Sequence, residues 1–375
     1  TLTLEDVDDQ FRRRSIWGCT DMKSSRFVAA CTATVATAAA IILLRFVGDR
    51  RRIDGSVRRA IKSAGTSSGP RGAHWQKDVV IVKLGGAAIT CKNKFETVDE
   101  KSMQAAVDLL ASHHKRGIKM VIVHGAGSFG HFHAKKYKIS EGVAAHAESL
   151  LGASLCRRSV KLLNQKLLAR LTSAGVPAMT VSPFPTTVGC TGAGVGAFVI
   201  EEEGSLAAVE KILAAGYVPL VHGDVILDSK LGHTILSGDT IIEAMCARLH
   251  PRRAVFITDV RGVFSRPPSD PKAKLIHAVR IERESGRMFF HPDLGEEIKT
   301  EAAEHDVTGG IQAKLASAAR IVRAEGTTIF IGNVSSKTTS DAIGGTAIPE
   351  EGLSIKDKHS IDNELSVGGT WLLGK

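Results

Sequence analysis

The chain has 375 residues, of which 43% are hydrophobic and 23% charged, and its formal net charge is +10. This composition is that of a globular protein and excludes a wholly disordered chain, while the length allows one large α/β domain or two ordinary ones. Much of the positive charge lies in short basic runs near the N-terminus, so charge alone does not predict a nucleic-acid partner. The six cysteines are scattered, without a CxxC pair or a zinc-ligand spacing, and we interpret them as reduced intracellular thiols.

The first 75 residues differ in composition from the rest and form an N-terminal extension. Residues 27–44 are an uncharged run with basic residues on both sides, and their number is the minimum for a membrane span. Because this run is mostly Ala and Thr, a targeting segment or an upstream sequence that is not normally translated competes with an anchor. Residues 63–72 are typical of a flexible linker. We expect a cytoplasmic catalytic domain that is free or tethered to a membrane by residues 27–44.

From residue 78 onward, short β-rich runs alternate with helical patterns, which is typical of a parallel sheet covered by helices. Most predicted strands are continuous apolar runs of the kind buried on both faces. We therefore predict an α/β fold, a three-layer αβα sandwich with a mainly parallel central sheet and with ligands at the carboxyl ends of its strands. The predicted strands are residues 79–83, 119–124, 178–182, 218–222, 254–258 and 327–331; the helices are residues 102–115, 155–174, 206–214, 240–249 and 312–324; residues 225–235 form a hairpin.

The first predicted strand ends in Lys83-Leu84-Gly85-Gly86. Paired glycines after a buried strand let backbone N–H groups approach a phosphate without a Cβ in the way. The motif is not a Walker A sequence, because its lysine precedes the glycines. Taken alone, such a pair is more often an ordinary tight turn.

The second predicted strand ends in the sequence HGAGSFGH at residues 124–131. It contains a formal GxGxxG pattern, which would also suit a dinucleotide-binding oxidoreductase. That alternative needs an acidic residue closing the next strand about 20 residues on, whereas Glu148 lies in a helical, Ala-rich stretch. Two glycine loops on neighbouring strands instead suit a donor and an acceptor phosphate that face each other. The terminal His131, taken alone, is more often a surface histidine.

Three further motifs occur later in the chain. The sequence SGD at residues 237–239 opens a predicted helix, TDVRGVF begins at Thr258, and DVTGG at residues 306–310 precedes Lys314. Each has a plain interpretation as a helix cap, a turn or a solvated lysine. The occurrence of all five motifs in this order is much harder to explain by separate turns.

Together the five motifs resemble the ordered signature of the amino acid kinase superfamily, and HGAGSFGH with its terminal histidine resembles isopentenyl phosphate kinases in particular. The resemblance covers about residues 77–348. It implies a phosphotransferase that uses ATP and Mg²⁺ and acts on a prenyl monophosphate, isopentenyl phosphate above all. It also implies a homodimer, without a nucleic-acid partner, and it assigns no protein ligand to the metal. A kinase for a carboxylate or nucleotide acceptor is the alternative within this fold, and the histidine of HGAGSFGH argues against it.

The resemblance also implies a role for each matching residue. Lys83 would contact the transferring phosphoryl group, with Lys92 as a second lysine just beyond the first loop, and Lys314 would lie on the ATP side. Asp239 would hold the lysines in position, and His131 would donate a hydrogen bond to the acceptor phosphate. The other implied residues are Gly86, Ala87, Gly125, Ala126, Gly127 and Gly130 on the acceptor side, and Gly85, Asp259 and Gly262, with Lys83 and Lys314, on the nucleotide side.

Two features depart from the family pattern. Ala87 stands where members commonly have serine, so one side-chain hydrogen bond to phosphate is expected to be absent, although a backbone N–H can serve there. The Gly-Thr pair that usually precedes the last strand could be Gly345-Thr346 or Gly369-Thr370. We therefore place the kinase domain at residues 76–350, with residues 351–375 as a tail or as its last strand. Residues 141–155 are expected to wall an apolar pocket for the prenyl tail.

Overall fold

The computed structural model describes residues 78–192, 198–291, 310–346 and 368–374. The N-terminal extension with its apolar run at residues 27–44 lies outside these ranges, as does most of the DVTGG motif. No helix within the described ranges has the length and apolar character needed to cross a lipid bilayer.

All six predicted core strands are present, with ends shifted by at most two residues: β1 Val80–Leu84, β2 Met120–His124, β3 Ala178–Val181, β6 Val218–His222, β9 Arg253–Thr258 and β14 Thr328–Asn333. Three more strands complete the same sheet: β12 Ala278–Ile281, β13 Met288–His291 and β15 Thr370–Gly374. The strand order is β13-β12-β15-β14-β9-β1-β2-β6-β3. Every neighbouring pair is parallel except β12 with β13 and β14 with β15, so the prediction of a mainly parallel sheet is confirmed.

The central strands are continuous apolar runs because both faces of the sheet are covered. Every residue of β1, β2, β6 and β9 is buried. The register pairs Leu84 with His124 and with Ile257, and His124 with His222. Four strands therefore end at one edge of the sheet, where the loops that follow them meet.

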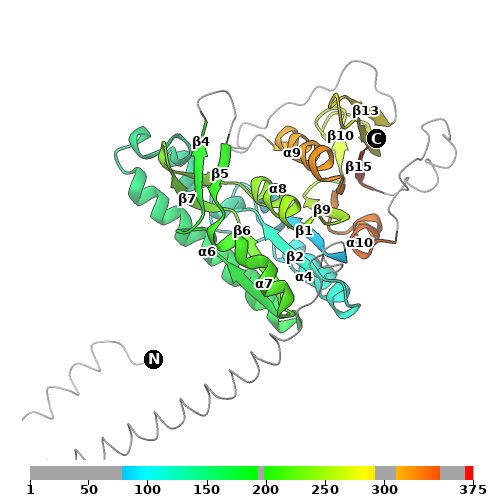
Figure 1. Ribbon diagram of the computed structural model, residues 1–375, viewed down its shortest axis with the longest axis horizontal. Coiled ribbons are helices and arrows are strands. Elements are labelled where there is room, and N and C mark those ends of the chain that lie inside the picture. Colours follow the sequence, from blue (N-terminus) through cyan, green and yellow to red (C-terminus); the bar gives the residue numbers. More distant parts are fainter. Residues whose placement is uncertain (1–77, 193–197, 292–309, 347–367, 375) are drawn as a thin grey trace, which may run out of the picture. The chain divides into compact units, whose positions relative to one another are not determined.

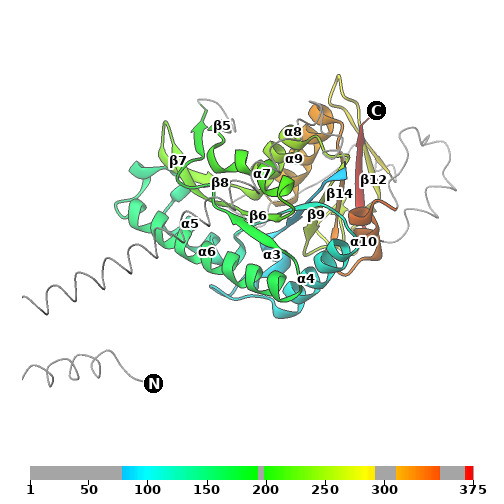
Figure 2. The same cartoon turned by 60° about the horizontal axis from the view of Figure 1, so that its bottom comes forward.

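Helices form a layer on each face of the sheet (Figures 1 and 2). Side chains alternate along β1, so Val80 and Val82 pack into one core with Met103 and Leu163, while Ile81 packs into the other with Met245 and its neighbours. The predicted three-layer sandwich is confirmed. The first layer contains α3 Gly86–Ile89, α4 Glu100–Lys115, α6 Ser149–Ser173 and α10 Lys337–Gly344; the second contains α7 Val209–Ala214, α8 Gly238–Leu249 and α9 Gly310–Glu325.

Two of the predicted helices differ most from the structure. Helix α6 starts at Ser149, earlier than the predicted residue 155, and contains Gly152, at which a Cβ would lie 2.2 Å from the Tyr137 ring. The predicted helix 206–214 is a 3₁₀ segment, η5 Gly204–Ala208, followed by α7. Smaller elements complete the first half of the chain: η2 Gly127–Phe129, α5 His131–Lys136, η3 Ile139–Glu141 and η4 Val143–Ala145.

A second, four-stranded sheet carries the predicted hairpin. Its order is β5-β4-β7-β8, with β4 Val188–Thr191, β5 Phe198–Glu202, β7 Asp224–Asp228 and β8 Gly232–Leu236. The Asp228 carboxylate accepts from the backbone N–H groups of Lys230 and Leu231 and so closes the turn of the hairpin. A small ribbon of β10 Val263–Phe264 and β11 Leu275–Ile276 completes the described strands.

The last strand, β15, lies inside the main sheet between β12 and β14 and directly follows Gly369. Of the two Gly-Thr pairs considered above, Gly369-Thr370 is therefore the one that precedes the last strand. Trp371 in this strand is 1% exposed, and its ring centroid lies 4.8 Å from that of Phe330.

We expect Trp371→Ala to lower the free energy of unfolding by about 3 to 5 kcal/mol, because it opens a cavity in the core. The matched control is Phe289→Ala, which truncates an aromatic side chain that is 41% exposed and should cost less than about 1 kcal/mol. Urea unfolding monitored by circular dichroism measures both. Equal losses would show that β15 does not contribute to the core as described.

Candidate active site

The glycine loops that follow β1 and β2 touch each other through their backbones. A Cβ on Gly86 would lie 2.1 Å from the Gly127 nitrogen, and a Cβ on Gly125 would lie 2.8 Å from the Gly86 nitrogen. Gly127 also has a φ of +52°, a conformation that favours glycine. Glycine is required in these loops because there is no room for a side chain between them.

Thr90 joins the two loops by hydrogen bonds. Its hydroxyl donates to the Gly86 carbonyl oxygen at 2.8 Å and accepts from the Ser128 backbone N–H at 3.1 Å. The Gly125 N–H donates to the Leu84 carbonyl oxygen at 2.9 Å. Side-chain and backbone hydrogen bonds thus hold the two predicted phosphate loops in one fixed arrangement.

Lys83 lies beside these loops and is almost completely buried. Its residue is 4% exposed, and its Nζ lies 2.9 Å from Oδ1 of Asp239 in the first turn of α8. A buried ammonium group needs such a partner, since an unpaired charge would cost several kcal/mol. A Cβ on Gly238 would lie 2.9 Å from Lys83 Cε, so the glycine of the SGD motif leaves room for the lysine. The structure thereby places two of the predicted site residues in one ion pair.

A second ion pair joins the loop after α3 to the loop after β9. Lys92 Nζ lies 2.7 Å from Oδ2 of Asp259, and the two side chains are 62% and 36% exposed. The sequence assigned Asp259 to the nucleotide side and placed Lys92 just beyond the first loop, without predicting that they pair. Because both are partly solvated, this contact is weaker and more easily exchanged than the one between Lys83 and Asp239.

The remaining predicted residues lie around this centre. His131 is the first residue of α5, directly after the second glycine loop. Lys314 lies in α9, one turn before Ser317, whose hydroxyl donates to the Asp239 carbonyl oxygen at 3.4 Å. Residues that are one turn apart share a helix face, so Lys314 lies on the side of α9 that packs against α8.

The structure also places three more of the predicted loop residues. Ala87 is half-buried in α3. At Gly130 a Cβ would lie 2.4 Å from the Ala126 Cβ, and at Gly262 it would lie 2.7 Å from Thr370 Oγ1. Gly262 therefore allows the loop after β9 to pack closely against the last strand, which its assignment to the nucleotide side did not predict.

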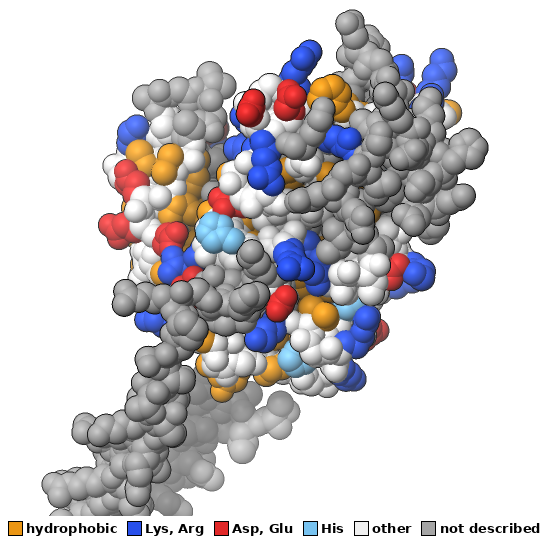
Figure 3. Space-filling view, turned by 45° about the vertical axis from the view of Figure 1, so that its right-hand side comes forward, with side chains coloured by type: hydrophobic (Ala, Val, Ile, Leu, Met, Phe, Trp, Pro, Cys, Tyr) orange, Lys and Arg blue, Asp and Glu red, His pale blue; other side chains and the backbone are white. Residues whose placement is uncertain are grey.

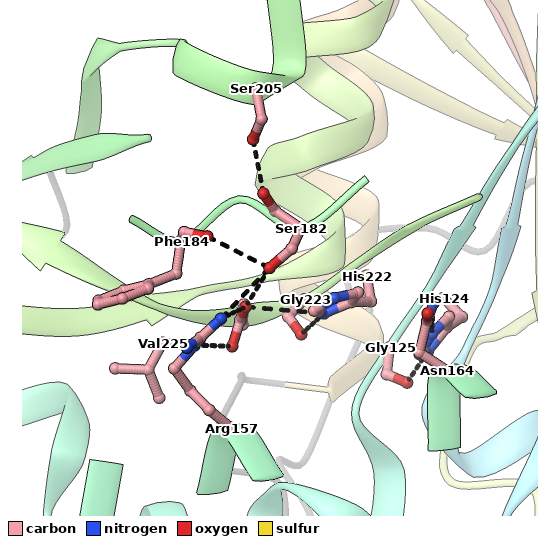
Figure 4. A network of polar contacts seen from close by, with 11 residues as sticks. His124, Gly125, Arg157, Asn164, Ser182, Phe184, Ser205, His222, Gly223 and Val225 are labelled. Atoms are coloured by element: carbon pink, nitrogen blue, oxygen red, sulfur yellow. Dashed lines mark hydrogen bonds and ion pairs between the residues drawn. The ribbon is translucent and has the colours of Figure 1, made fainter. Parts of the chain in front are cut away.

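A buried histidine pair lies at the strand ends and was not predicted from the sequence. His124 ends β2 and His222 ends β6, both are buried, and their rings stack with centroids 5.7 Å apart. Each Nδ1 lies close to the carbonyl oxygen of the following glycine, at 3.0 Å for Gly125 and 3.1 Å for Gly223 (Figure 4). The signal was present in the sequence, because both strands end in Val-His and are followed by Gly.

A carboxylate and a guanidinium group support the second of these histidines. Asp224 follows Gly223, is buried, and accepts from Arg157 Nε at 3.1 Å and Nη2 at 3.2 Å. The Ser182 hydroxyl bonds the same carboxylate, and the Arg157 guanidinium lies 4.1 Å from the centroid of the Phe184 ring. Figure 4 shows that this network connects α6 to the ends of β3 and β6.

Burial keeps both histidines neutral. Desolvation, with a smaller effect of His222, lowers the pKa of His124 to about 3. Desolvation also lowers the pKa of His222, against the opposing effect of Asp224. The positive charge near the loops therefore comes from lysine and not from these rings.

Charged groups elsewhere on the described surface are mixed in sign. Acidic side chains lie between Lys and Arg on the face in Figure 3, and Arg320 pairs in two contacts with Glu243, at 3.0 and 2.6 Å. Among the described residues, no group of three or more His, Cys, Asp or Glu side chains is arranged to hold a metal ion.

Comparison with known proteins agrees with this geometry. Residues 78–333 match the amino acid kinase family. The chain belongs to the amino acid kinase family. It is 32% identical over 316 residues to an isopentenyl phosphate kinase of Arabidopsis thaliana, covering 73% of this chain and 93% of the relative. It is 31% identical over 250 residues to an isopentenyl phosphate kinase of Methanothermobacter thermautotrophicus, covering 63% of this chain and 84% of the relative.

A solved structure is similar in fold as well as in sequence. An X-ray structure of isopentenyl phosphate kinase matches with a TM-score of 0.57 and 28% identity, covering 72% of this chain and 97% of that chain. The predicted amino acid kinase fold is thereby confirmed. In this amino acid kinase, the two glycine loops, Lys83 and Asp239 occupy the edge of the sheet at which the sequence placed the ligands.

The contact between the loops leads to a first prediction about this site. We expect Gly86→Ala to lower the free energy of unfolding by more than about 2 kcal/mol, because the added Cβ overlaps the backbone at Gly127. Ala87→Ser is the matched control, since it adds one atom to a residue that already has a Cβ. Urea unfolding compares them, and an unchanged midpoint for Gly86→Ala would contradict the contact.

The neutral state of His124 makes stability depend on pH. In the unfolded chain this histidine is protonated below its ordinary pKa of about 6.5, whereas in the folded protein its pKa is lowered to about 3. The contribution of this neutral ring to the free energy of unfolding is complete above pH 6.5 and is lost as the pH falls toward 3. Lowering the pH from about 7.5 to about 5 should remove about 2 kcal/mol through this residue alone.

His124→Asn provides the measurement, because asparagine does not titrate. Urea unfolding at both pH values should show a smaller loss of stability in the variant than in the wild-type protein, by about that 2 kcal/mol. The same loss in both proteins would show that His124 is not held neutral by burial.

Proposed function

We propose that this amino acid kinase transfers the γ-phosphoryl group of ATP to isopentenyl phosphate, giving isopentenyl diphosphate and ADP. The observation that carries the proposal is the direct contact of two glycine loops beside the buried pair of Lys83 and Asp239. Backbone N–H groups from two touching loops can bind two phosphates head to head. The prenyl acceptor is supported by the HGAGSFGH sequence and by relatives that are named isopentenyl phosphate kinase.

Charge repulsion is the main obstacle to this reaction, because the nucleophile and the γ-phosphate are both anionic. In phosphoryl transfer, positioned cations and backbone donors supply most of the catalysis. We assign this neutralisation to Lys83, Lys92 and Lys314, with His131 as a hydrogen-bond donor to the acceptor phosphate. Asp239 orients Lys83 and lowers the repulsion among the lysines.

The reaction needs no general base. A phosphate monoester has a second pKa near about 6, so it is largely dianionic at neutral pH and can attack the γ-phosphate in line. The buried His124 and His222 are accordingly not assigned as proton acceptors. They lie beneath the loops, and their lowered pKa values keep them uncharged.

Mg²⁺ is proposed to enter the site with ATP. This ion keeps several waters and commonly binds through substrate phosphates, so the described residues suit it without a carboxylate cluster of their own. When bound, it would supply neutralisation of phosphate charge. No described residue is assigned as a ligand of Mg²⁺. The roles proposed for the lysines do not require a protein ligand to the ion.

The isoprenoid tail is proposed to lie against a small apolar cluster beside the second glycine loop. Tyr137, Ile139, Cys156, Val160 and Val225 are buried in this cluster. Ala126 of the loop packs against it, together with side chains of α6 and β8, so the cluster adjoins the proposed phosphate position. None of these five residues lies in the segment 141–155 that the sequence indicated, but Ala153 and Leu155 of that segment pack against the cluster.

Direct assay of the full chain tests the proposal. The protein is mixed with Mg-ATP and, separately, isopentenyl phosphate, geranyl phosphate, isopentenol, uridylate or acetylglutamate, and ADP release is measured. Phosphorus NMR then identifies the product. We expect ADP and a diphosphate with isopentenyl phosphate and none with isopentenol. Faster turnover of uridylate or acetylglutamate would overturn the assignment of the acceptor.

Two variants separate the roles of lysine and histidine. Lys83→Met should reduce kcat at least about tenfold, since one charge-assisted contact is worth about 1.5 to 3 kcal/mol. His131→Ala should lose turnover while ATP binding, measured by calorimetry, survives. Circular dichroism establishes that each variant is folded. Normal kinetics for Lys83→Met would discredit the proposed site, and loss of ATP binding in His131→Ala would remove that residue from the acceptor side.

A further inference from the structure

The contacts of His124 determine which ring nitrogen carries its proton. Nδ1 lies 3.0 Å from the Gly125 carbonyl oxygen, and a carbonyl oxygen can only accept, so Nδ1 donates. The ring is neutral, and Nε2 is therefore an acceptor, which Asn164 satisfies by donating from Nδ2 at 3.0 Å (Figure 4). Both ring nitrogens thus have a hydrogen-bond partner, and Asn164 selects the Nδ1–H tautomer.

The hydrogen bond from His124 also orients the peptide that joins Gly125 to Ala126. A trans peptide is planar, and its C=O and N–H groups point in opposite directions. When the Gly125 carbonyl oxygen is held toward the buried ring, the Ala126 N–H must point away from that ring. We propose that His124 is a positioning residue that presents the Ala126 N–H to the acceptor phosphate, an inference that rests on the proposed function.

The same hydrogen bond from a histidine ring to the next glycine occurs at the neighbouring strand end. This repetition argues against an accidental contact. His222 Nδ1 donates to the Gly223 carbonyl oxygen at 3.1 Å. The Gly223 N–H in turn donates to the carbonyl oxygen of His124 at 3.0 Å, so the backbone of His124 is fixed as well as its ring. The Asp224 carboxylate, which accepts from Arg157, lies 3.9 Å from the same Nδ1 atom of His222.

A purely structural role for His124 predicts a different result from a positioning role. A leucine fills much of the ring's volume but donates nothing. An asparagine is smaller, yet its side-chain nitrogen can take the place of Nδ1. If the ring only fills the core, asparagine is the more harmful substitution; if it orients the peptide, leucine is the more harmful one for the acceptor.

Steady-state kinetics of the full chain with isopentenyl phosphate and Mg-ATP compare these variants. His124→Leu should raise KM for isopentenyl phosphate at least about tenfold, which corresponds to one lost hydrogen bond to a charged group. In the same variant, KM for ATP should change less than about threefold. His124→Asn should stay within about threefold of the wild-type value for both substrates, although it loses thermal stability.

His113→Leu is the matched control. His113 is also fully buried, desolvation lowers its pKa, and its Nε2 bonds the Ser340 hydroxyl at 3.0 Å in another part of the fold. This variant should lose stability like His124→Leu but keep its KM for isopentenyl phosphate. An equal rise of KM in both leucine variants, or a larger rise in His124→Asn than in His124→Leu, would overturn the proposal.

A measurement that needs no turnover separates this inference from the proposed function. Long-range proton–nitrogen NMR of ¹⁵N-histidine protein at neutral pH should show His124 as the neutral Nδ1–H tautomer, and in Asn164→Leu this preference should weaken. Titration with inorganic phosphate should shift the Ala126 amide signal in the wild type and less in His124→Leu. An Nε2–H tautomer, or equal shifts in both proteins, would refute the positioning role even if the kinase activity is present.

Discussion

Backbone contact between two glycine loops is the constraint on which the site depends. Gly86 and Gly127 approach so closely that neither tolerates a side chain, and this approach is possible only because β1 and β2 are adjacent, parallel and end in register. Each loop offers N–H groups, but only the contact between the loops brings the two sets of donors together. Thr90 fixes the contact with one hydrogen bond to each loop.

The charges of the site are arranged in two pairs of different character. Lys83 and Asp239 are buried together, so the position of the ammonium group is set before any ligand binds. Lys92 and Asp259 are partly solvated, and their contact can be exchanged for a contact with phosphate at small cost. One pair is therefore suited to fixed orientation, and the other to binding and release.

Beneath the loops, neutral polar groups orient the backbone without adding charge. The stacked rings of His124 and His222 each bond to the glycine that follows them, and burial keeps the pKa of His124 far below the physiological range. Asn164 bonds Nε2 of His124, and Arg157 pairs with the buried Asp224 beside His222. A buried polar network of this kind is stable only when all its members are bonded, and it then holds a single arrangement.

The sequence alone determined the six core strands, the layer order, the family and most of the residues gathered around Lys83. These features follow from local patterns, such as apolar runs and the glycines after a strand. Tertiary structure decided what depends on pairs far apart in the chain. It paired Lys92 with Asp259, stacked His124 on His222, placed Gly262 against Thr370, and showed that Gly369-Thr370 precedes the last strand. Sequence periodicity reports which face of an element is buried, but it carries no information about which distant side chain meets it there.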